Sequence, residues 1–321
     1  MVSDEPILEA RRVQVRLGRG RARLLAVDRV DISVFRGRTV GLVGESGSGK
    51  STLARALVGL LKVSSGSVVL DGKDITNARG RQLARMRNRV QIIFQDPGSS
   101  LNPRMQIGQT IEEVVAVRSR RGQRGNRDRT VELLRQVGLD AALANRYPHQ
   151  LSGGQRQRVA IARALAAEPE VLILDEVTSS LDVSVQATVL NLLRRLQSEL
   201  DLGYLFISHN LSVVRYMSDT IAVMYLGRIL EHGHASAVLA GARHPYTHAL
   251  VKAIPVLGRR PEAEALGEAP DPRNPPSGCR YHRRCAVGPL VNADRRICID
   301  RDPSFMTDGS PAPVACHYAK S

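Results

Sequence analysis

The sequence has 321 residues, of which 43% are hydrophobic and 24% charged, so it can bury one large core and a smaller appendix. Its formal net charge of +15 suits a polyanion, but aromatic residues make up only 3% and tryptophan is absent, which leaves little for nucleic-acid bases to stack on. No run approaches the roughly 18–20 apolar residues of a membrane-spanning helix, and the N-terminus does not read as a secretory signal. We therefore expect no nucleic-acid partner, and we expect other chains to supply any membrane span.

Strands and helices are expected to alternate along most of the chain. Short strands are predicted at residues 7–15, 31–43, 68–70 and 90–94, with a helix from residue 51. Residues 105–165 are predicted to be mostly helical, and they are followed by a strand at 171–174, an amphipathic helix at 184–200 and strands at 204–207 and 220–224. This alternation predicts an α/β fold with a largely parallel sheet.

A glycine-rich segment between a buried-type strand and a helix fits the phosphate-loop pattern G-x-x-x-x-G-K-[ST]. It consists of Gly44, Glu45, Ser46, Gly47, Ser48, Gly49, Lys50, Ser51 and Thr52. Glycines let backbone N–H groups curl around phosphates, while Lys50 would neutralise phosphate charge and the Ser51 hydroxyl would bind Mg²⁺. A chance glycine-rich turn is the alternative, and the flanking strand and helix argue against it.

An acidic pair, Asp175 and Glu176, follows four apolar residues that are expected to form a central strand. Ligands bind at the carboxyl ends of strands in open α/β sheets. We expect Asp175 to reach Mg²⁺ and Glu176 to act as general base on the attacking water. Such a pair is also typical of a helix N-terminus, but together with the phosphate loop it predicts hydrolysis of a nucleoside triphosphate.

The sequence LSGGQ at 151–155 resembles the signature motif of ATP-binding-cassette proteins. In that family the motif acts on nucleotide held by the opposite subunit, so that two cassettes sandwich two ATP molecules. The residues that this implies are Ser152, Gly153, Gly154 and Gln155. Gln95 resembles the glutamine that contacts Mg²⁺ and the attacking water, and His209 resembles the histidine that senses the γ-phosphate. Residues 179–182 resemble the loop that crosses the dimer seam.

The resemblance implies a P-loop NTPase fold, with a RecA-like α/β core, an antiparallel β layer and an inserted helical subdomain at about 96–158. The cassette is expected to occupy residues 1–255. A small Cys-containing C-terminal extension is expected at 256–321.

The family residues that this chain retains imply a phosphate site that can hydrolyse ATP, because Glu176 and His209 are both present. They disfavour a non-catalytic structural partner in a mixed dimer. The family usually places an aromatic residue against adenine, but residues 14–17 contain none. Arg16, stacking through its guanidinium plane, or Leu17 is therefore expected to contact the base. ATP and Mg²⁺ are the implied cofactors.

Several stretches resemble the oligopeptide/dipeptide (and nickel) importer branch, namely residues 94–105, 182–193, 208–233 and 244–250. The resemblance implies a peripheral ATPase at the cytoplasmic face of the cell membrane that powers import of oligopeptides or dipeptides. Its implied partners are two transmembrane permease subunits, a second ATP-binding-cassette subunit (a heterodimer being favoured) and, indirectly, an extracytoplasmic substrate-binding protein. The alternatives are another substrate such as nickel, or a soluble cassette ATPase that acts on nucleic acid.

All cysteines lie near the C-terminus, and they are Cys279, Cys285, Cys298 and Cys316. Disulfides are rare in a reducing cytoplasm, and thiolate zinc sites usually have closely spaced cysteine pairs that are missing here. An iron–sulfur cluster takes four thiolates, and some members of the importer branch hold a 4Fe–4S cluster in this tail. The resemblance therefore implies a 4Fe–4S cluster, with zinc and unmetallated thiols as alternatives. Neighbouring arginines are expected to lower the thiolate pKa values; they are Arg280, Arg283, Arg284, Arg295 and Arg296.

Overall fold

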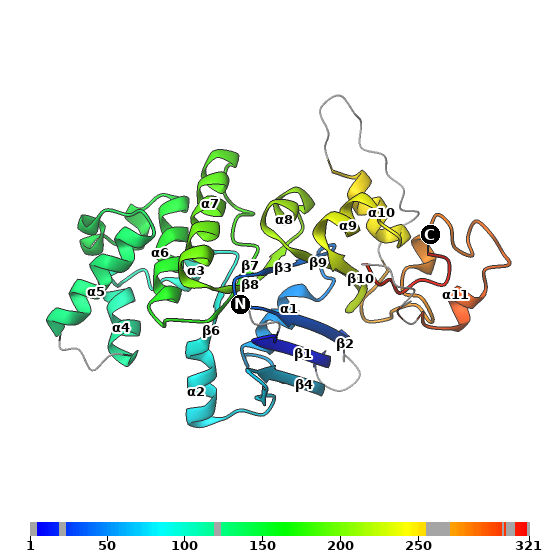
Figure 1. The fold of residues 1–321 in the computed structure, drawn as a ribbon, viewed down its shortest axis with the longest axis horizontal. Coiled ribbons are helices and arrows are strands. Elements are labelled where there is room, and N and C mark those ends of the chain that lie inside the picture. The colour runs from blue at the N-terminus through cyan, green and yellow to red at the C-terminus, as the bar shows by residue number, and fades with distance from the viewer. Residues whose placement is uncertain are drawn as a thin grey trace. The chain divides into compact units, whose positions relative to one another are not determined.

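The computed structural model describes residues 5–18, 24–118, 123–254, 270–303, 305 and 312–319 (Figure 1). The chain divides into two compact units. The first unit contains residues 1–8, 34–38 and 77–205, and the second contains residues 9–33, 39–76 and 206–321. The division falls inside strand β8 (Gly203–Ser208), which runs from the first unit into the second.

The second unit is built mainly from strands. Its elements, apart from terminal residues of β1 and β2, are β1 (Leu8–Leu17), β2 (Leu24–Val34), β3 (Thr39–Val43), α1 (Lys50–Leu57), β4 (Ser65–Leu70), β5 (Lys73–Asp74), α8 (Leu211–Met217), β9 (Thr220–Tyr225), β10 (Arg228–His234), α9 (Ala235–Ala240), α10 (Pro245–Lys252), the 3-10 helix η4 (His282–Arg284) and α11 (Ile297–Asp300). Four strands form one sheet in the order β2-β1-β4-β5. Strands β4 and β5 pair antiparallel through a tight turn, with Val69 opposite Asp74.

Strands β3, β9 and β10 of a second sheet lie in this unit, and β3 leads into the phosphate loop. All five residues of β3 are buried, and β3 pairs in parallel with β9, with Val40 opposite Thr220. Strand β10 pairs antiparallel with β9. A strand buried on both faces has a continuous apolar sequence, which is why residues 40–43 are recognisable in the sequence. The single strand predicted at 31–43 is instead two strands, β2 and β3, because the chain turns at Gly37, where φ is 63°.

The first unit is mostly helical. Its elements, together with the start of β8, are α2 (Gly80–Arg89), β6 (Val90–Ile93), α3 (Pro97–Ser100), α4 (Ile107–Arg118), α5 (Gln123–Gln136), the 3-10 helices η2 (Ala141–Asn145) and η3 (Pro148–Gln150), α6 (Gly153–Leu165), β7 (Val171–Asp175) and α7 (Val183–Leu200). Helix α4 packs against α5 and α6, as the green part of Figure 1 shows.

Strand β7 forms the centre of the first unit. All five of its residues are buried, and it pairs in parallel with β6, with Val90 opposite Val171. The helix predicted at 184–200 is α7, whose buried face includes Leu193 and Leu196. The helical subdomain expected at about 96–158 and the boundary at residue 255 stay predictions, and residue 255 lies outside the described residues.

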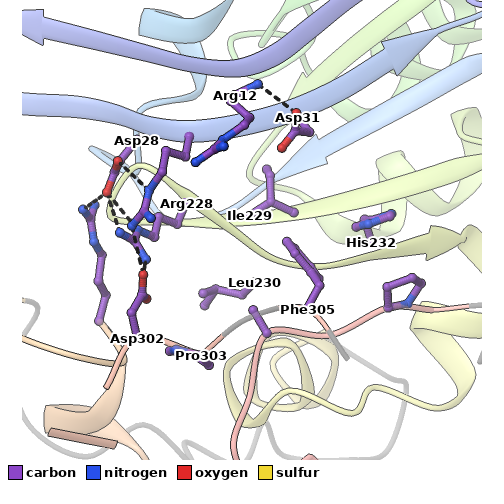
Figure 2. Close-up of a pocket in the computed structure, with 14 residues that line it drawn as sticks. Arg12, Asp28, Asp31, Arg228, Ile229, Leu230, His232, Asp302, Pro303 and Phe305 are labelled. Carbon is purple, nitrogen blue, oxygen red and sulfur yellow. Dashed lines mark hydrogen bonds and ion pairs between the residues drawn. The ribbon is translucent and has the colours of Figure 1, made fainter. Parts of the chain in front are cut away.

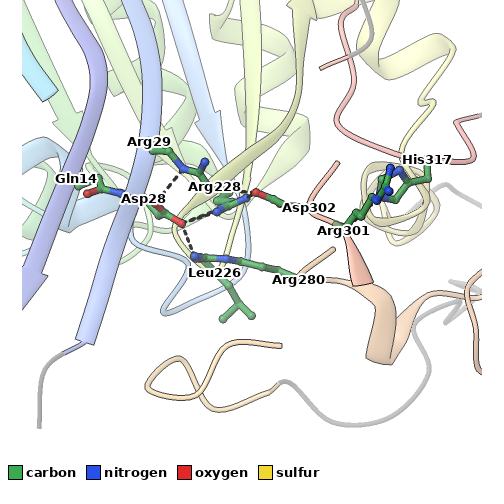
Figure 3. A network of polar contacts seen from close by, with 9 residues as sticks. All are labelled: Gln14, Asp28, Arg29, Leu226, Arg228, Arg280, Arg301, Asp302 and His317. Carbon is green, nitrogen blue, oxygen red and sulfur yellow. Dashed lines mark hydrogen bonds and ion pairs between the residues drawn. The ribbon is translucent and has the colours of Figure 1, made fainter. Parts of the chain in front are cut away.

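A polar network in the second unit ties residues near the C-terminus to strands β2 and β10 (Figure 3). At its centre is Asp28, which is only 4% exposed. Its carboxylate accepts hydrogen bonds from Arg228, at 2.7 and 2.9 Å, and from Arg280. Asp302 in turn pairs with Arg29, at 3.0 Å, and with Arg228. Two carboxylates and three guanidinium groups thus link segments that lie far apart in the sequence.

A cavity of about 750 Å³ borders this network (Figure 2). Its charged side includes Asp28, Arg228 and Asp302, and its apolar side includes Leu230 and Phe305. The cavity lies entirely within the second unit.

Candidate functional site

The phosphate loop is the turn between β3 and α1. Its main chain lies so close to neighbouring strands that two positions require glycine. A Cβ atom on Gly44 would lie 2.0 Å from the carbonyl oxygen of Met224, and one on Gly49 would lie 2.2 Å from that of Ala26. Gly49 also has a φ of 105°, which residues with a side chain rarely adopt. Packing therefore holds this loop in a single curved path.

Lys50 closes this loop from the inside. Its side chain is buried, and Nζ donates to the carbonyl oxygens of Gly44 and Glu45, each at 2.8 Å, and to Ser48 Oγ at 3.3 Å. An ammonium group has three N–H donors, and here they reach oxygens of the loop. The adjoining first turn of α1, with the half-buried Ser51, adds backbone N–H groups at the positive end of the helix dipole. The arrangement concentrates positive charge where a phosphate group would bind.

The remaining residues of the predicted loop differ in exposure. Ser46 and Gly47 are exposed at its tip, and Thr52 is half-buried in the first turn of α1. Exposure at the tip leaves the loop accessible from solvent.

The acidic pair lies in the first unit, at the carboxyl end of β7. Asp175 is the last residue of the strand and is 4% exposed, whereas Glu176 is half-buried. The φ of Glu176 is 52°, a left-handed conformation that costs free energy for a residue with a side chain. Ser179 Oγ donates to the carbonyl oxygen of Glu176 at 2.9 Å, and Gln95 Nε2 donates to Ser179 Oγ at 3.3 Å. The structure therefore brings Gln95 together with the turn that holds Glu176.

The signature segment forms the N-terminus of α6. Ser152 is the N-cap residue, and its Oγ accepts a hydrogen bond from the backbone N–H of Gln155 at 3.2 Å. The side chain of Gln155 accepts one from the backbone N–H of Ser152 at 2.9 Å, which completes a capping box. A Cβ atom on Gly154 would lie 2.4 Å from the side chain of Val185, so helix α7 leaves no room for a larger residue there. Gly153 is half-buried beside it.

Replacing Ser152 with alanine is expected to destabilise the first unit by about 1 kcal/mol, because the N–H of Gln155 loses its acceptor. The thermal midpoint should fall by roughly 2–4 °C. Ser152→Asp is the matched variant, since aspartate also caps helices well and should keep most of the stability. Equal midpoints for Ser152→Ala and the unchanged protein in differential scanning calorimetry would show that the cap contributes nothing.

His209 and Arg16 both lie in the second unit. His209 is exposed and directly follows β8, immediately before Asn210, the N-cap of α8. Arg16 lies near the end of β1, where its side chain is exposed and its backbone N–H donates to Ser64 Oγ at 3.0 Å. The neighbouring Leu17 is half-buried. These positions leave the proposed roles of His209 and Arg16 as predictions.

The prediction of an iron–sulfur cluster is wrong. No three His, Cys, Asp or Glu residues in the part of the chain that the structure describes are grouped so that they could hold a metal ion. All four cysteines are instead buried free thiols. The backbone N–H of Cys279 donates to the carbonyl oxygen of Cys298 at 2.8 Å. This main-chain hydrogen bond joins the two ends of the segment from Cys279 to Cys298.

The expected lowering of thiolate pKa values by an arginine is present at Cys285 and Cys298, but burial raises the pKa of all four cysteines overall. Burial raises the pKa of Cys279 to about 12 and that of Cys316 to about 11. The charge of Arg295 lowers the pKa of Cys285 and Cys298, but burial outweighs it and both are raised. The thiols thus remain protonated at neutral pH.

Two residues that the sequence does not point to contact the phosphate loop. Tyr246 Oη accepts a hydrogen bond from the backbone N–H of Glu45 at 2.9 Å, and Arg284 Nη1 donates to the Glu45 carboxylate at 2.8 Å. Tyr246 belongs to residues 244–250 (HPYTHAL), which in the sequence indicate the importer branch but no contact with the phosphate loop. That resemblance is the sequence feature that could have drawn attention to Tyr246. The residues around Arg284 do not distinguish it from Arg283, which is exposed and lies beside it.

The phosphate loop between a buried parallel strand and a helix, with a carboxylate pair after another buried strand, defines a P-loop ATPase. Residues 27–179 match the family model for ABC transporters, and residues 230–288 match the model for the oligopeptide/dipeptide transporter C-terminal region. None of the helices that the structure describes has both the length and the apolar character required to cross a bilayer.

Comparison with known proteins narrows the class further. The chain is 44% identical over 298 residues to the oligopeptide transport ATP-binding protein AppF of Bacillus subtilis, covering 91% of this chain and 89% of the relative. It is 48% identical over 281 residues to the oligopeptide transport ATP-binding protein OppF of Salmonella typhimurium, covering 85% and 84%. A solved cassette, MJ0796 in a dimeric post-hydrolysis state bound to ADP and Pi, aligns with a TM-score of 0.65 and 28% identity over 71% of this chain and 98% of that one. The chain belongs to the ABC transporter ATPases, in the family of oligopeptide/dipeptide ATP-binding proteins.

Proposed function

We propose that this chain hydrolyses ATP to power the import of oligopeptides or dipeptides. The observation that carries the proposal is the 44–48% identity, over most of each chain, to proteins named for oligopeptide transport. The match to the oligopeptide/dipeptide C-terminal region supports the same branch. Within the cassette fold we propose a RecA-like core with an antiparallel β layer, a helical subdomain at about 96–158 and a C-terminal extension at 256–321.

The phosphate loop is proposed to bind the ATP phosphates. The buried ammonium group of Lys50 would neutralise their charge, and Arg16 or Leu17 would contact the adenine. The proposed Mg²⁺ ligands, Ser51, Asp175 and Gln95, offer hydroxyl, carboxylate and amide oxygens, which is the donor chemistry that this ion prefers. Bound with ATP, Mg²⁺ would offset the negative charge of the phosphates.

Hydrolysis is assigned to Glu176 as the general base that takes a proton from the attacking water. Gln95 donates a hydrogen bond to Ser179, whose hydroxyl in turn donates to the carbonyl oxygen of Glu176. The amide of Gln95 is therefore proposed to respond to changes in the conformation of this turn. His209 is proposed to contact the γ-phosphate.

The proposed assembly contains two transmembrane permease subunits and a second cassette at the cytoplasmic face of the membrane. The signature segment, Ser152 to Gln155, would contact ATP bound by that second cassette, since its capped helix N-terminus presents N–H groups suited to phosphate. A solved cassette of the same fold is a dimer, which supports this arrangement. A second cassette of different sequence is favoured.

The proposal predicts that peptide accelerates ATP hydrolysis by the assembled transporter. The chain would be reconstituted with its permease subunits, second cassette and binding protein in proteoliposomes, and phosphate release measured with and without the tripeptide trialanine. We expect peptide to stimulate hydrolysis about tenfold and labelled peptide to be taken up. Substrate loading would favour the closed cassette dimer, and a tenfold shift in that population needs only about 1.4 kcal/mol.

Two added probes decide between the proposal and its alternatives. Stimulation by Ni²⁺ but not by trialanine would assign the chain to metal import. Stimulation of the isolated chain by DNA, steeply weakened by salt, would contradict a role in transport.

A further inference from the structure

Glu45 lies in the phosphate loop and forms hydrogen bonds with residues from other parts of the second unit. Its backbone N–H donates to Tyr246 Oη at 2.9 Å, and its carbonyl oxygen accepts from Lys50 Nζ at 2.8 Å. Its carboxylate accepts from Arg284 Nη1, also at 2.8 Å. Every polar group of this residue thus has a defined partner. Two of its partners, Tyr246 and Arg284, come from the part of the chain after residue 240.

Arg284 is built into its position by aromatic side chains. Only 11% of its side chain is exposed. Its guanidinium lies 6.0 Å from the ring centre of Tyr281, within reach of a cation–π contact, and 3.5 Å from Tyr225 Oη. The rings of Tyr225, Tyr246 and Tyr281 contact one another with centres 4.7–5.3 Å apart. This aromatic cluster restricts the arginine side chain.

The charge of Arg284 is directed at the loop. Burial alone would lower its pKa, but its contacts with Glu45 and Tyr225 outweigh burial and raise the pKa further, so it is always cationic. Burial raises the pKa values of Tyr225 and Tyr281, which are therefore neutral at physiological pH and do not balance this charge. Among the described residues, the carboxylate that pairs with Arg284 is that of Glu45.

A carboxylate in a phosphate loop is electrostatically unfavourable for binding ATP, because like charges repel at short range. The Glu45 side chain is 35% exposed, so water screens that repulsion only in part. An arginine that pairs with this carboxylate offsets its charge and holds it in one orientation. Loss of the arginine would leave the loop with a mobile negative charge.

We propose that Arg284 is a positioning residue for ATP binding that acts through Glu45, neutralising its carboxylate and fixing the loop in the shape that receives the phosphates. The inference rests on the proposed role of the phosphate loop. It assigns to the C-terminal part of the chain a contribution to nucleotide affinity that acts through the phosphate loop.

The test measures the dissociation constant for MgATP of the full-length chain by isothermal titration calorimetry. Arg284→Ala is expected to weaken binding about tenfold, and Arg284→Lys, which keeps the charge, by less. The matched control is Arg283→Ala, which removes a neighbouring exposed arginine from the same 3-10 helix and should stay within twofold. In the assembled transporter Arg284→Ala should raise KM for ATP and leave kcat nearly unchanged.

The decisive variant is Arg284→Ala combined with Glu45→Gln. If the uncompensated carboxylate causes the defect, removing its charge should restore affinity to within about threefold of the unchanged protein. The defect of Arg284→Ala should also shrink at high salt, because mobile ions screen the repulsion. A purely structural role in folding the C-terminal segment would show neither rescue nor this salt dependence.

The outcomes separate this inference from the function on which it rests. Unchanged affinity in Arg284→Ala, or a loss that Glu45→Gln does not rescue, overturns the inference while the unchanged protein still binds ATP. Failure of the unchanged protein to bind MgATP overturns the proposed function and this inference with it. Thermal denaturation of each variant identifies any loss that comes from unfolding.

Discussion

Replacing Glu176 with glutamine is expected to slow ATP hydrolysis by at least about a hundredfold while leaving ATP binding intact. A general base contributes roughly 10²–10⁴-fold to the rate, and an amide cannot accept the proton of the attacking water. Glutamine has nearly the same shape as glutamate, so the side chain should still fit its half-buried position after β7. Phosphate release at saturating ATP, with the dissociation constant measured in parallel, checks both parts.

The backbone at Glu176 makes the choice of substitution important. Its φ of 52° is strained for any residue with a side chain, and Ser179 Oγ holds its carbonyl oxygen at 2.9 Å. Glutamine keeps both the strain and this hydrogen bond, whereas glycine would relieve the strain and change two properties at once. A loss of hydrolysis in Glu176→Gln therefore reports on the carboxylate itself.

Glu168→Gln is the matched control. Glu168 lies in the same unit, has a φ of 50° and is exposed, where it pairs with Arg118 at 2.9 Å. Exposed ion pairs contribute little to stability, so this variant should hydrolyse ATP at the unchanged rate. Full activity in Glu176→Gln would remove Glu176 from the catalytic role, and equal losses in both variants would indicate a general effect on the fold.

The sequence predicts those parts of the fold and site that are determined by residues close together in the sequence. Strands β3 and β7 are each buried along their full length, so their apolar runs are recognisable without knowledge of their partners. The phosphate loop is a local pattern as well, although the close approach of Met224 and Ala26 that requires glycine at Gly44 and Gly49 is not visible in that pattern. The break between β2 and β3 escaped prediction because residues that favour strands lie on both sides of it, and only Gly37 marks the turn.

The parts that escaped prediction depend on residues far apart in the sequence. Arg284 is 239 residues from Glu45, and Arg280 is 252 residues from Asp28. The pKa values of the nearby thiols are raised because the cysteines are buried, and burial outweighs the charge of Arg295. The sequence shows arginines beside cysteines but not the burial that decides the protonation state of the thiols. This is the physical reason why the thiolate prediction failed.

Replacing Asp28 with alanine is expected to destabilise the second unit by about 3–5 kcal/mol, because it leaves buried guanidinium groups without their counter-ion. Arg280 is 7% exposed and Arg228 has a 19% exposed side chain. Burial lowers the pKa of Arg280 only to about 10, so it stays charged at neutral pH. The thermal midpoint should fall on the order of 10 °C, and amide hydrogen exchange around residues 279–285 should accelerate.

The control for this substitution is Asp300→Ala, an exposed aspartate in α11. It removes the same group from a neighbouring segment, but water solvates that carboxylate in both the folded and unfolded states, so no measurable change is expected. A midpoint for Asp28→Ala as high as that of Asp300→Ala would show that the network in Figure 3 does not hold the C-terminal residues in place.

The pH dependence tests the charge of Asp28 separately from its shape. Burial alone would raise its pKa, but hydrogen bonds from Arg228 and Gln14 and the charge of Arg280 outweigh burial and lower it below its ordinary value of 3.8. A carboxylate with a lowered folded-state pKa stabilises the fold above the unfolded-state pKa and loses that contribution as the pH falls through the folded-state value. The difference in free energy of unfolding between the unchanged protein and Asp28→Asn should therefore be constant above about pH 5 and shrink towards pH 3. A difference that stays the same at pH 7 and pH 3 would mean that hydrogen-bonding shape, and not charge, accounts for the contribution of Asp28.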